Sequence, residues 1–204
     1  MEKAKYENQK MLTKQYITGV ILAGGKNSRM GSDKGLLQFG GKSIMERQIE
    51  VLQPLVNDII IIHNGKHYSH LGYQVHEDLI LDCGPMGGIY TALKVSQTPK
   101  NFILSCDMPF ICPELVKLIF EEAKNCEIAI PRHGEKLEPL CAVYDLSCLA
   151  TFKELLDQKA LKMMDALKFF KVKEIRVPQE ILDTKPFTNI NTPEDYLKIK
   201  FAKN

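Results

Sequence analysis

The chain has 204 residues, of which 45% are hydrophobic and 25% are charged. These fractions are typical of a globular domain and exclude a disordered, collagenous or coiled-coil protein as the first interpretation. The net charge is +2, and four lysines and two glutamates in the first sixteen residues already account for it, so the formally neutral remainder argues against a general nucleic-acid-binding protein.

The sequence shows no membrane-directed segment. No stretch approaches the roughly 20 apolar residues of a transmembrane helix, and the basic N-terminal residues lack the apolar core of a signal peptide. We therefore expect residues 1–15 to be a flexible basic leader, residues 16–204 to form the domain, and the protein to be cytoplasmic.

The six cysteines and five histidines predict neither a disulfide framework nor a structural zinc site. No two cysteines have the CxxC spacing, and no paired Cys/His ligand spacing occurs. We expect buried, reduced thiols. His67 and His70 could share a surface, but the favoured interpretation is a solvated loop.

Strand-like apolar runs alternate with segments of helical period along the chain. Residues 17–22 and the isoleucine run at 58–62 predict buried strands, and Ser43 with Glu46 predicts a capping box at the start of a helix over 43–55. A short run at 74–76 and strands at 101–105, 127–130, 140–144 and 175–177 alternate with helices at 87–95, 113–124, 148–156, 162–170 and after Thr192. This alternation predicts one α/β domain with a mostly parallel central sheet and helices on both faces.

The loop after the first predicted strand combines glycines with basic residues. Glycines at 24, 25, 31 and 35 let the backbone approach a ligand, and Lys26, Arg29 and Lys34 against Asp33 give a local charge of +2. This composition suits a polyphosphate. The loop has neither the P-loop nor the dinucleotide GxGxxG pattern, and a flexible glycine loop with solvated basic residues is the alternative.

Two aspartates follow other predicted strands. Asp107 ends the apolar run Ile103-Leu104-Ser105-Cys106, and Asp78 follows the run at 74–76. Ligands of open α/β sheets bind beyond the carboxyl ends of the strands, where a carboxylate such as Asp107 can hold Mg²⁺. Capping or turn roles are the alternatives for both aspartates. The residues supply no Ser/His/Asp or Cys/His nucleophile arrangement.

The segment LAGGKNSRMGSDKGLLQFGGKSI closely resembles the signature of the nucleotidyltransferases, and in particular of the molybdenum cofactor guanylyltransferase family. The resemblance covers the chain from about residue 16 onward. Further matching motifs, in order, are HEDL at 76–79, GPMGGI at 84–89, LSCDMPF at 104–110, EPLCAVY at 138–144 and NINTPEDY at 189–196. The resemblance implies a single Rossmann-like domain.

The resemblance also implies a role for individual residues. Leu22, Ala23 and Gly24 would contact the guanine nucleotide through the backbone, and Arg29 matches the arginine of the signature loop. Lys34 would bind phosphate, Asp78 the nucleotide, and Asp107 both the nucleotide and Mg²⁺. Asn189 and Asn191 match a pair on the metal and pterin side. Relatives carry Asn where this chain has His63 followed by Asn64, so the alignment leaves open which of the two contacts the nucleotide.

The implied reaction joins GTP to the molybdopterin cofactor, forms the guanine dinucleotide and releases pyrophosphate, with Mg²⁺ as cofactor. In this interpretation Arg29, Lys34 and Asp107 are the catalytic residues. The resemblance also implies transient contact with other cofactor-biosynthesis proteins and molybdoenzyme chaperones, and none with nucleic acid or membranes. The alternatives are a molybdopterin cytidylyltransferase, a sugar nucleotidyltransferase, and a non-catalytic nucleotide sensor.

Overall fold

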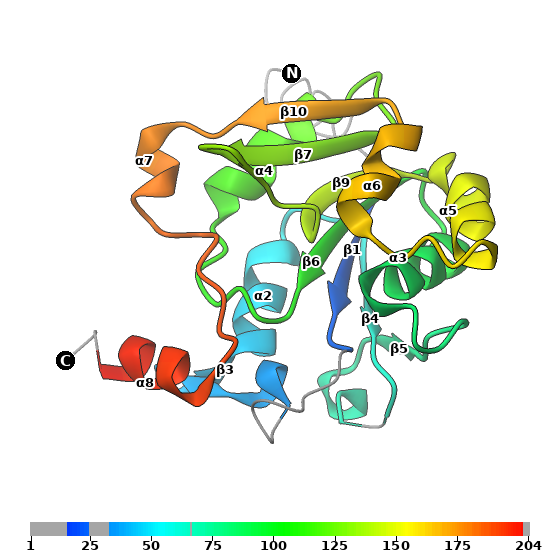
Figure 1. Ribbon diagram of the computed structural model, residues 1–204. Coiled ribbons are helices and arrows are strands. Elements are labelled where there is room, and N and C mark those ends of the chain that lie inside the picture. The colour runs from blue at the N-terminus through cyan, green and yellow to red at the C-terminus, as the bar shows by residue number, and fades with distance from the viewer. Residues whose placement is uncertain (1–15, 25–32, 66, 202–204) are drawn as a thin grey trace, which may run out of the picture.

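Helices cover both faces of a central sheet (Figure 1) in the computed structural model, which describes residues 16–24, 33–65 and 67–201. The described strands form one eight-stranded sheet in the order β10-β7-β9-β6-β1-β4-β5, with β8 paired to β7, and a separate two-stranded hairpin, β2-β3. The predicted leader, residues 1–15, lies outside the described residues.

The main-sheet strands are β1 (Ile17–Leu22), β4 (Asp58–Ile62), β5 (Gln74–His76), β6 (Lys100–Ser105), β7 (Ile128–His133), β8 (Lys136–Leu137), β9 (Cys141–Asp145) and β10 (Val172–Arg176). The hairpin strands are β2 (Gln38–Phe39) and β3 (Lys42–Ser43). The helices are α2 (Ile44–Leu52), α3 (Gly84–Val95), α4 (Pro113–Glu122), α5 (Cys148–Asp157), α6 (Met163–Ala166), α7 (Gln179–Leu182) and α8 (Pro193–Phe201). Three 3₁₀ helices are η1 (Lys34–Leu36), η2 (Ser69–Leu71) and η3 (Leu167–Phe169).

The sheet is mostly parallel, as the alternating pattern predicts. β1 pairs in parallel with both β4 and β6, β4 with β5, and β10 with β7. β9 runs antiparallel between β6 and β7. Between β7 and β9, the chain reverses direction in the β7–β8 hairpin.

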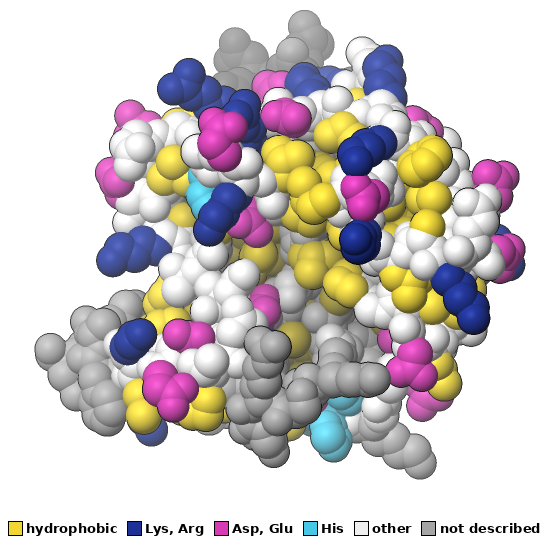
Figure 2. All heavy atoms as spheres, viewed as in Figure 1, with side chains coloured by type: hydrophobic (Ala, Val, Ile, Leu, Met, Phe, Trp, Pro, Cys, Tyr) yellow, Lys and Arg dark blue, Asp and Glu magenta, His cyan; other side chains and the backbone are white. Residues whose placement is uncertain are grey.

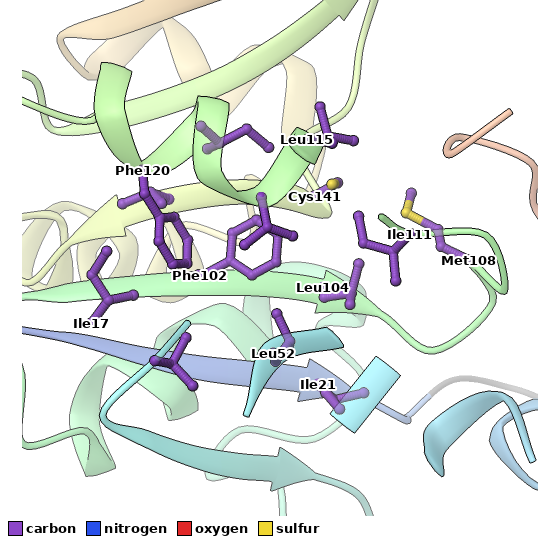
Figure 3. Close-up of a cluster of buried hydrophobic side chains, with 14 of the residues drawn as sticks. Ile17, Ile21, Leu52, Phe102, Leu104, Met108, Ile111, Leu115, Phe120 and Cys141 are labelled. Atoms are coloured by element: carbon purple, nitrogen blue, oxygen red, sulfur yellow. The ribbon is translucent and has the colours of Figure 1, made fainter. Parts of the chain in front are cut away.

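The central strands are buried on both faces, and their side chains alternate between two hydrophobic cores. Ile21 and Ile61 join the core under α2 and α4, whereas Val20 and Ile60 join the core under α3 and α5. Figure 3 shows the first core, where Phe102 of β6 lies between α4 and the sheet. Because both faces of these strands are buried, their sequences are continuous apolar runs and do not alternate between apolar and polar residues.

Helix starts follow the predicted local signals. Ser43 is the N-cap of α2, where its side chain and that of Glu46 form the predicted capping box, and Pro113 takes the first position of α4. The helix predicted over 162–170 is wrong in its second half. The chain tightens into η3 and leaves it at Phe170 in an extended conformation, which buries Phe170 against Phe152 with ring centroids 5.0 Å apart and leaves Phe169 exposed.

A third, smaller core holds the C-terminal segment against the hairpin. Ile190 and Ile199 pack with Phe39 and Ile44, and the Tyr196 hydroxyl donates to the Gln38 carbonyl oxygen at 2.7 Å. In Figure 1, α8 lies beside β3, far in sequence but close in space. This packing brings the residues just before α8 to the carboxyl edge of the sheet.

Several composition-based expectations can be compared with the described part of the chain. Its helices include none that is long and apolar enough to cross a membrane. All six cysteines are free, four of them buried and two half-buried, as predicted for reduced thiols. On the face shown in Figure 2, basic and acidic side chains are interspersed around the rim, in agreement with the near-neutral charge of the chain.

The capping box leads to a stability prediction. Ser43→Ala removes the side-chain oxygen that accepts the Glu46 N–H and should lower the free energy of unfolding by about 1 kcal/mol. The control is Glu154→Ala, at an exposed position of α5 away from its N-terminal end. We expect that variant to change stability by less than about 0.5 kcal/mol. Equal losses in chemical denaturation would contradict the capping role.

Candidate active site

The carboxyl ends of the three central strands are joined by backbone hydrogen bonds. The Ala23 N–H donates to the Ile62 carbonyl at 2.9 Å, and the Cys106 N–H donates to the Leu22 carbonyl at 3.1 Å. These bonds fix the backbone of Leu22 and Ala23, from which Gly24 continues toward Asp78. A Cβ at Gly24 would lie 3.7 Å from the Asp78 carboxylate, so the two predicted nucleotide-contacting segments are neighbours.

Lys34, Asp107 and Asn191 meet at the same edge. The Lys34 ammonium donates to the Asn191 side-chain oxygen at 2.8 Å and lies 3.5 Å from the Asp107 carboxylate. The Ile190 N–H donates to the Asp107 carbonyl at 3.0 Å. Asp107 and Asn191 are 73 and 157 positions from Lys34 along the chain. The fold thus brings both residues to one lysine.

Three oxygen atoms at this edge are buried and have no hydrogen-bond partner in the part of the chain that the structure describes: Asp78 Oδ1, Asp107 Oδ1 and Asn189 Oδ1. Buried polar atoms in proteins are nearly always hydrogen-bonded, to water or ligand where not to protein. All three are acceptors. They are therefore suited to bind a cation or a donor group of a ligand.

A buried glutamine supports the loop that carries Asp107, and the sequence interpretation missed it. Gln48 of α2 is fully buried, and its side-chain amide donates to the carbonyls of Ser105 at 2.8 Å and Met108 at 3.0 Å. The loop is therefore held from beneath on both sides of Asp107. A signal was available, because Gln48 occupies a position on the apolar face of the predicted helix.

Asp78 and Asn64 form a mutual pair. The Asn64 side-chain amide donates to Asp78 Oδ2 at 3.0 Å, and its oxygen accepts the Asp78 N–H at 2.8 Å. Burial raises the pKa of the Asp78 carboxyl, although Asn64 and His63 oppose that shift. His63 instead turns inward, with Nδ1 3.1 Å from the Ala23 carbonyl oxygen. Of the two residues that the alignment left open, Asn64 is the one beside Asp78.

The thiol next to Asp107 is not an activated nucleophile. Cys106 is buried, and burial together with the nearby Asp107 and Asp33 raises the pKa of its thiol to about 12. It therefore stays protonated at neutral pH and adds no charge to the edge where Lys34 lies.

Arg29 and Asp33 both belong to the signature segment, but only Asp33 is among the residues that the structure describes. Arg29, predicted as a catalytic residue, lies outside the described residues, as does the rest of the loop from 25 to 32. The sequence predicts for Asp33 only that it offsets part of the positive charge of that loop. In the structure it is buried and faces His63 and His67, a grouping that the spacing in the sequence did not indicate.

The chain matches the family described as the MobA-like NTP transferase domain over residues 19–172. It is 37% identical over 187 residues to a protein of Pelotomaculum thermopropionicum, with 90% of this chain and 91% of the relative covered. It is 39% identical over 185 residues to a protein of Flavobacterium johnsoniae, with 88% and 94% covered. Both relatives carry the name "Probable molybdenum cofactor guanylyltransferase".

Among solved structures, the chain is similar to molybdopterin-guanine dinucleotide biosynthesis protein A from Archaeoglobus fulgidus. The TM-score is 0.76 at 24% identity, with 90% of this chain and 96% of that chain covered. The fold is that of a nucleotidyltransferase. The chain belongs to the MobA-like NTP transferase family.

The raised pKa of the Asp78 carboxyl predicts that removing its charge stabilises the protein. Removing the charge of a carboxylate with a lowered pKa has the opposite effect. Because the pKa of Asp78 is raised in the folded state, the folded protein is destabilised once the carboxyl ionises. Asp78→Asn keeps the acceptor for Asn64 and should raise the melting temperature at neutral pH. The gain should shrink as the pH falls and vanish below the ordinary carboxyl pKa of about 4, where the group is protonated in both states.

Asp145→Asn is the matched control. Burial would raise the pKa of this carboxyl, but its ion pair with Lys100 at 2.9 Å and its bonds to Ser147 outweigh burial and lower it. The control variant should therefore lower the melting temperature at neutral pH, and this loss should fade as the pH falls. A destabilising Asp78→Asn in the same pH series would contradict the interpretation.

Proposed function

We propose that this nucleotidyltransferase transfers GMP from GTP to the molybdopterin cofactor, forming the guanine dinucleotide and releasing pyrophosphate. The observation that carries the proposal is the meeting of Lys34, Asp107 and Asn191 beside the Leu22–Gly24 strand end. The names of the relatives in Pelotomaculum and Flavobacterium support the same substrate pair.

The reaction needs charge neutralisation and alignment rather than a covalent intermediate. The terminal phosphate of the cofactor attacks the α-phosphorus of GTP in line, and pyrophosphate leaves as the P–O bond breaks. The attacking phosphate oxygen is already ionised at neutral pH, so no general base is required. Both reactants are anionic. Lys34, which is among the described residues, is a cation placed to reduce their repulsion.

The proposed roles of the other residues follow their positions. Backbone groups of Leu22, Ala23 and Gly24 would contact guanine. The carbonyls of Leu22 and Ala23 already accept one hydrogen bond each, but a carbonyl oxygen has a second lone pair. Asp78 would bind the nucleotide.

On the opposite side of Lys34, Asn189 and Asn191 would face the pterin substrate. Arg29, outside the described residues, would hold phosphate with Lys34. Contact with other cofactor-biosynthesis proteins and molybdoenzyme chaperones remains a prediction, as does a cytoplasmic location.

The residues present fit Mg²⁺. Among the described residues, the buried oxygen atoms Asp107 Oδ1 and Asn189 Oδ1 have no hydrogen-bond partner. Mg²⁺ binds through one or two carboxylates together with substrate phosphates. Asp107 would hold the ion with help from Asn189. When bound, Mg²⁺ supplies positive charge at the reacting phosphate. The 3.5 Å separation between Lys34 and Asp107 keeps the lysine close enough to contact the same phosphate chain.

The central experiment is a comparison of nucleotides. The protein is incubated with the molybdopterin cofactor and Mg²⁺, and with GTP, CTP or ATP in parallel, while pyrophosphate release and product mass are measured. GTP should be preferred by at least about 100-fold in kcat/KM, because a site built on hydrogen bonds to one base leaves its polar groups unpaired with another.

Each alternative function has its own outcome in this assay. Equal or better turnover of CTP would identify a cytidylyltransferase. Pyrophosphate release with a sugar phosphate, and none with the pterin, would identify a sugar nucleotidyltransferase. Nucleotide binding without release would indicate a sensor.

A second prediction concerns Asp107. Asp107→Asn preserves the shape of the side chain but removes its charge, and it should reduce turnover by at least about 100-fold, the effect of losing one preorganised charged group. GTP binding without Mg²⁺ should stay the same or tighten, since a carboxylate near phosphates repels them. The control is Asp157→Asn, an exposed carboxylate paired with Lys153 on α5. An unchanged Mg²⁺ dependence of activity in Asp107→Asn would contradict the metal role.

A further inference from the structure

A cluster outside the Lys34–Asp107 edge joins Asp33, His63 and His67. Asp33 Oδ2 lies 3.3 Å from His67 Nδ1 and 3.8 Å from His63 Nε2. One ligand atom from each of the three residues lies within 4.8 Å of the others. The side chains of Asp33 and His63 are 5% and 8% exposed, whereas that of His67 is 62% exposed. Two members are therefore fixed in the interior, and the third closes the group from the surface.

His63 presents an unpartnered nitrogen to this cluster. Its Nδ1 faces the Ala23 carbonyl oxygen at 3.1 Å. A carbonyl can only accept, so Nδ1 carries the proton. When the ring is neutral, Nε2 offers a lone pair, and this buried atom has no hydrogen-bond partner among the residues that the structure describes. A lone pair directed at a carboxylate in the interior is unfavourable unless a positive charge lies between them.

Gly65 lies directly beside that nitrogen. Gly65, with φ of +152°, passes so close to His63 that a Cβ there would lie 3.0 Å from Nε2. A side chain at this position would crowd the nitrogen, and glycine avoids that contact.

Asp33 is oriented by bonds to its other oxygen. Asp33 Oδ1 accepts the Gly35 N–H at 3.1 Å and also the hydroxyl of Tyr68, a fully buried residue. Tyr68 also packs edge-on against the His63 ring, with centroids 4.9 Å apart. These contacts leave Oδ2 directed at the two imidazoles. An imidazole held by a carbonyl and a carboxylate held by donors form the support that surrounds metal ligands in proteins.

We propose that Asp33, His63 and His67 bind a divalent transition-metal ion, with Zn²⁺ as the best match. Two imidazole nitrogens and one carboxylate oxygen are a typical zinc donor set, whereas Mg²⁺ prefers oxygen ligands. A tetrahedral ion with bonds of about 2.0–2.1 Å separates its ligand atoms by about 3.3 Å, close to the separations from Asp33 Oδ2. Three protein ligands leave the fourth position to water on the exposed side of His67.

The site is distinct from the one proposed for Mg²⁺, yet adjacent to it in sequence. Asp33 precedes Lys34, whose ammonium is directed at Asp107 and Asn191. An ion on Asp33 would connect this segment to the end of β4 through His63 and, through the Ala23 carbonyl, to the end of β1. It would therefore hold the strand ends and the start of η1 in one arrangement. Histidine side chains are visible on the surface at the lower edge of Figure 2.

The test is metal binding by the full-length, tag-free protein, independent of its activity. Zn²⁺ is titrated calorimetrically in excess Mg²⁺, and Co²⁺ is used as a spectroscopic probe because its visible absorption reports coordination number and thiolate ligands. We expect one equivalent to bind with nitrogen and oxygen ligation and no thiolate band. His67→Ala should weaken binding at least about tenfold. Since His67 is exposed, this variant should fold normally.

His70→Ala is the matched control, because His70 is an exposed histidine of the same loop outside the cluster. It should bind the ion as the unmodified protein does. Asp33→Asn serves as a second ligand variant and should also weaken binding. Equal binding by the His67 and His70 variants, a thiolate spectrum, or no binding by the unmodified protein would each overturn the proposal. None of these outcomes depends on whether the chain uses GTP.

Discussion

The parallel pairing of β1 with both β4 and β6 is the constraint on which the site depends. The register aligns Leu22 with Ile62 on one side and with Ser105 on the other, so all three strands end at one level. The residues that follow, Ala23, His63 and Cys106, continue the backbone bonding for one more position. Asp107 and the end of β1 are therefore neighbours because of sheet register, before any side chain is considered.

Most of the fold could be predicted because it rests on local patterns. The isoleucine run at 58–62 predicts an interior strand, and the Ser43 and Glu46 pair predicts a helix start, since both signals act within a few residues. Asp107 could be placed at the sheet edge for the same reason, because it follows an apolar strand directly. The end of the helix predicted over 162–170 was missed because the burial of Phe170 against Phe152, a tertiary contact, overrides helical periodicity.

The rest of the site depends on contacts between distant residues, which one sequence does not display. The hydrogen bond between Lys34 and Asn191 joins residues 157 positions apart. In the sequence, only the family resemblance indicates that Asn191 belongs to the site. The apolar pattern around Gln48 predicts that it lies in a helix. Its role, however, follows from hydrogen bonds to two carbonyls more than fifty residues away in the sequence. The grouping of Asp33 with His63 and His67 requires the loop after β4 to fold back onto the start of η1, a path that no spacing rule predicts.

The position of Asn191 has a consequence for how the protein matures during synthesis. A ribosome makes the chain from its N-terminus, so the seven main-sheet strands up to β9 are synthesised before residue 150. The partners of Lys34 and Asp107 at 189–191, and the core that fixes them through Ile190 and Ile199, emerge some forty residues later. A nascent chain can thus complete most of its sheet while the edge at Lys34 and Asp107 is still open. The segment at 189–199 then closes that edge of an already folded scaffold.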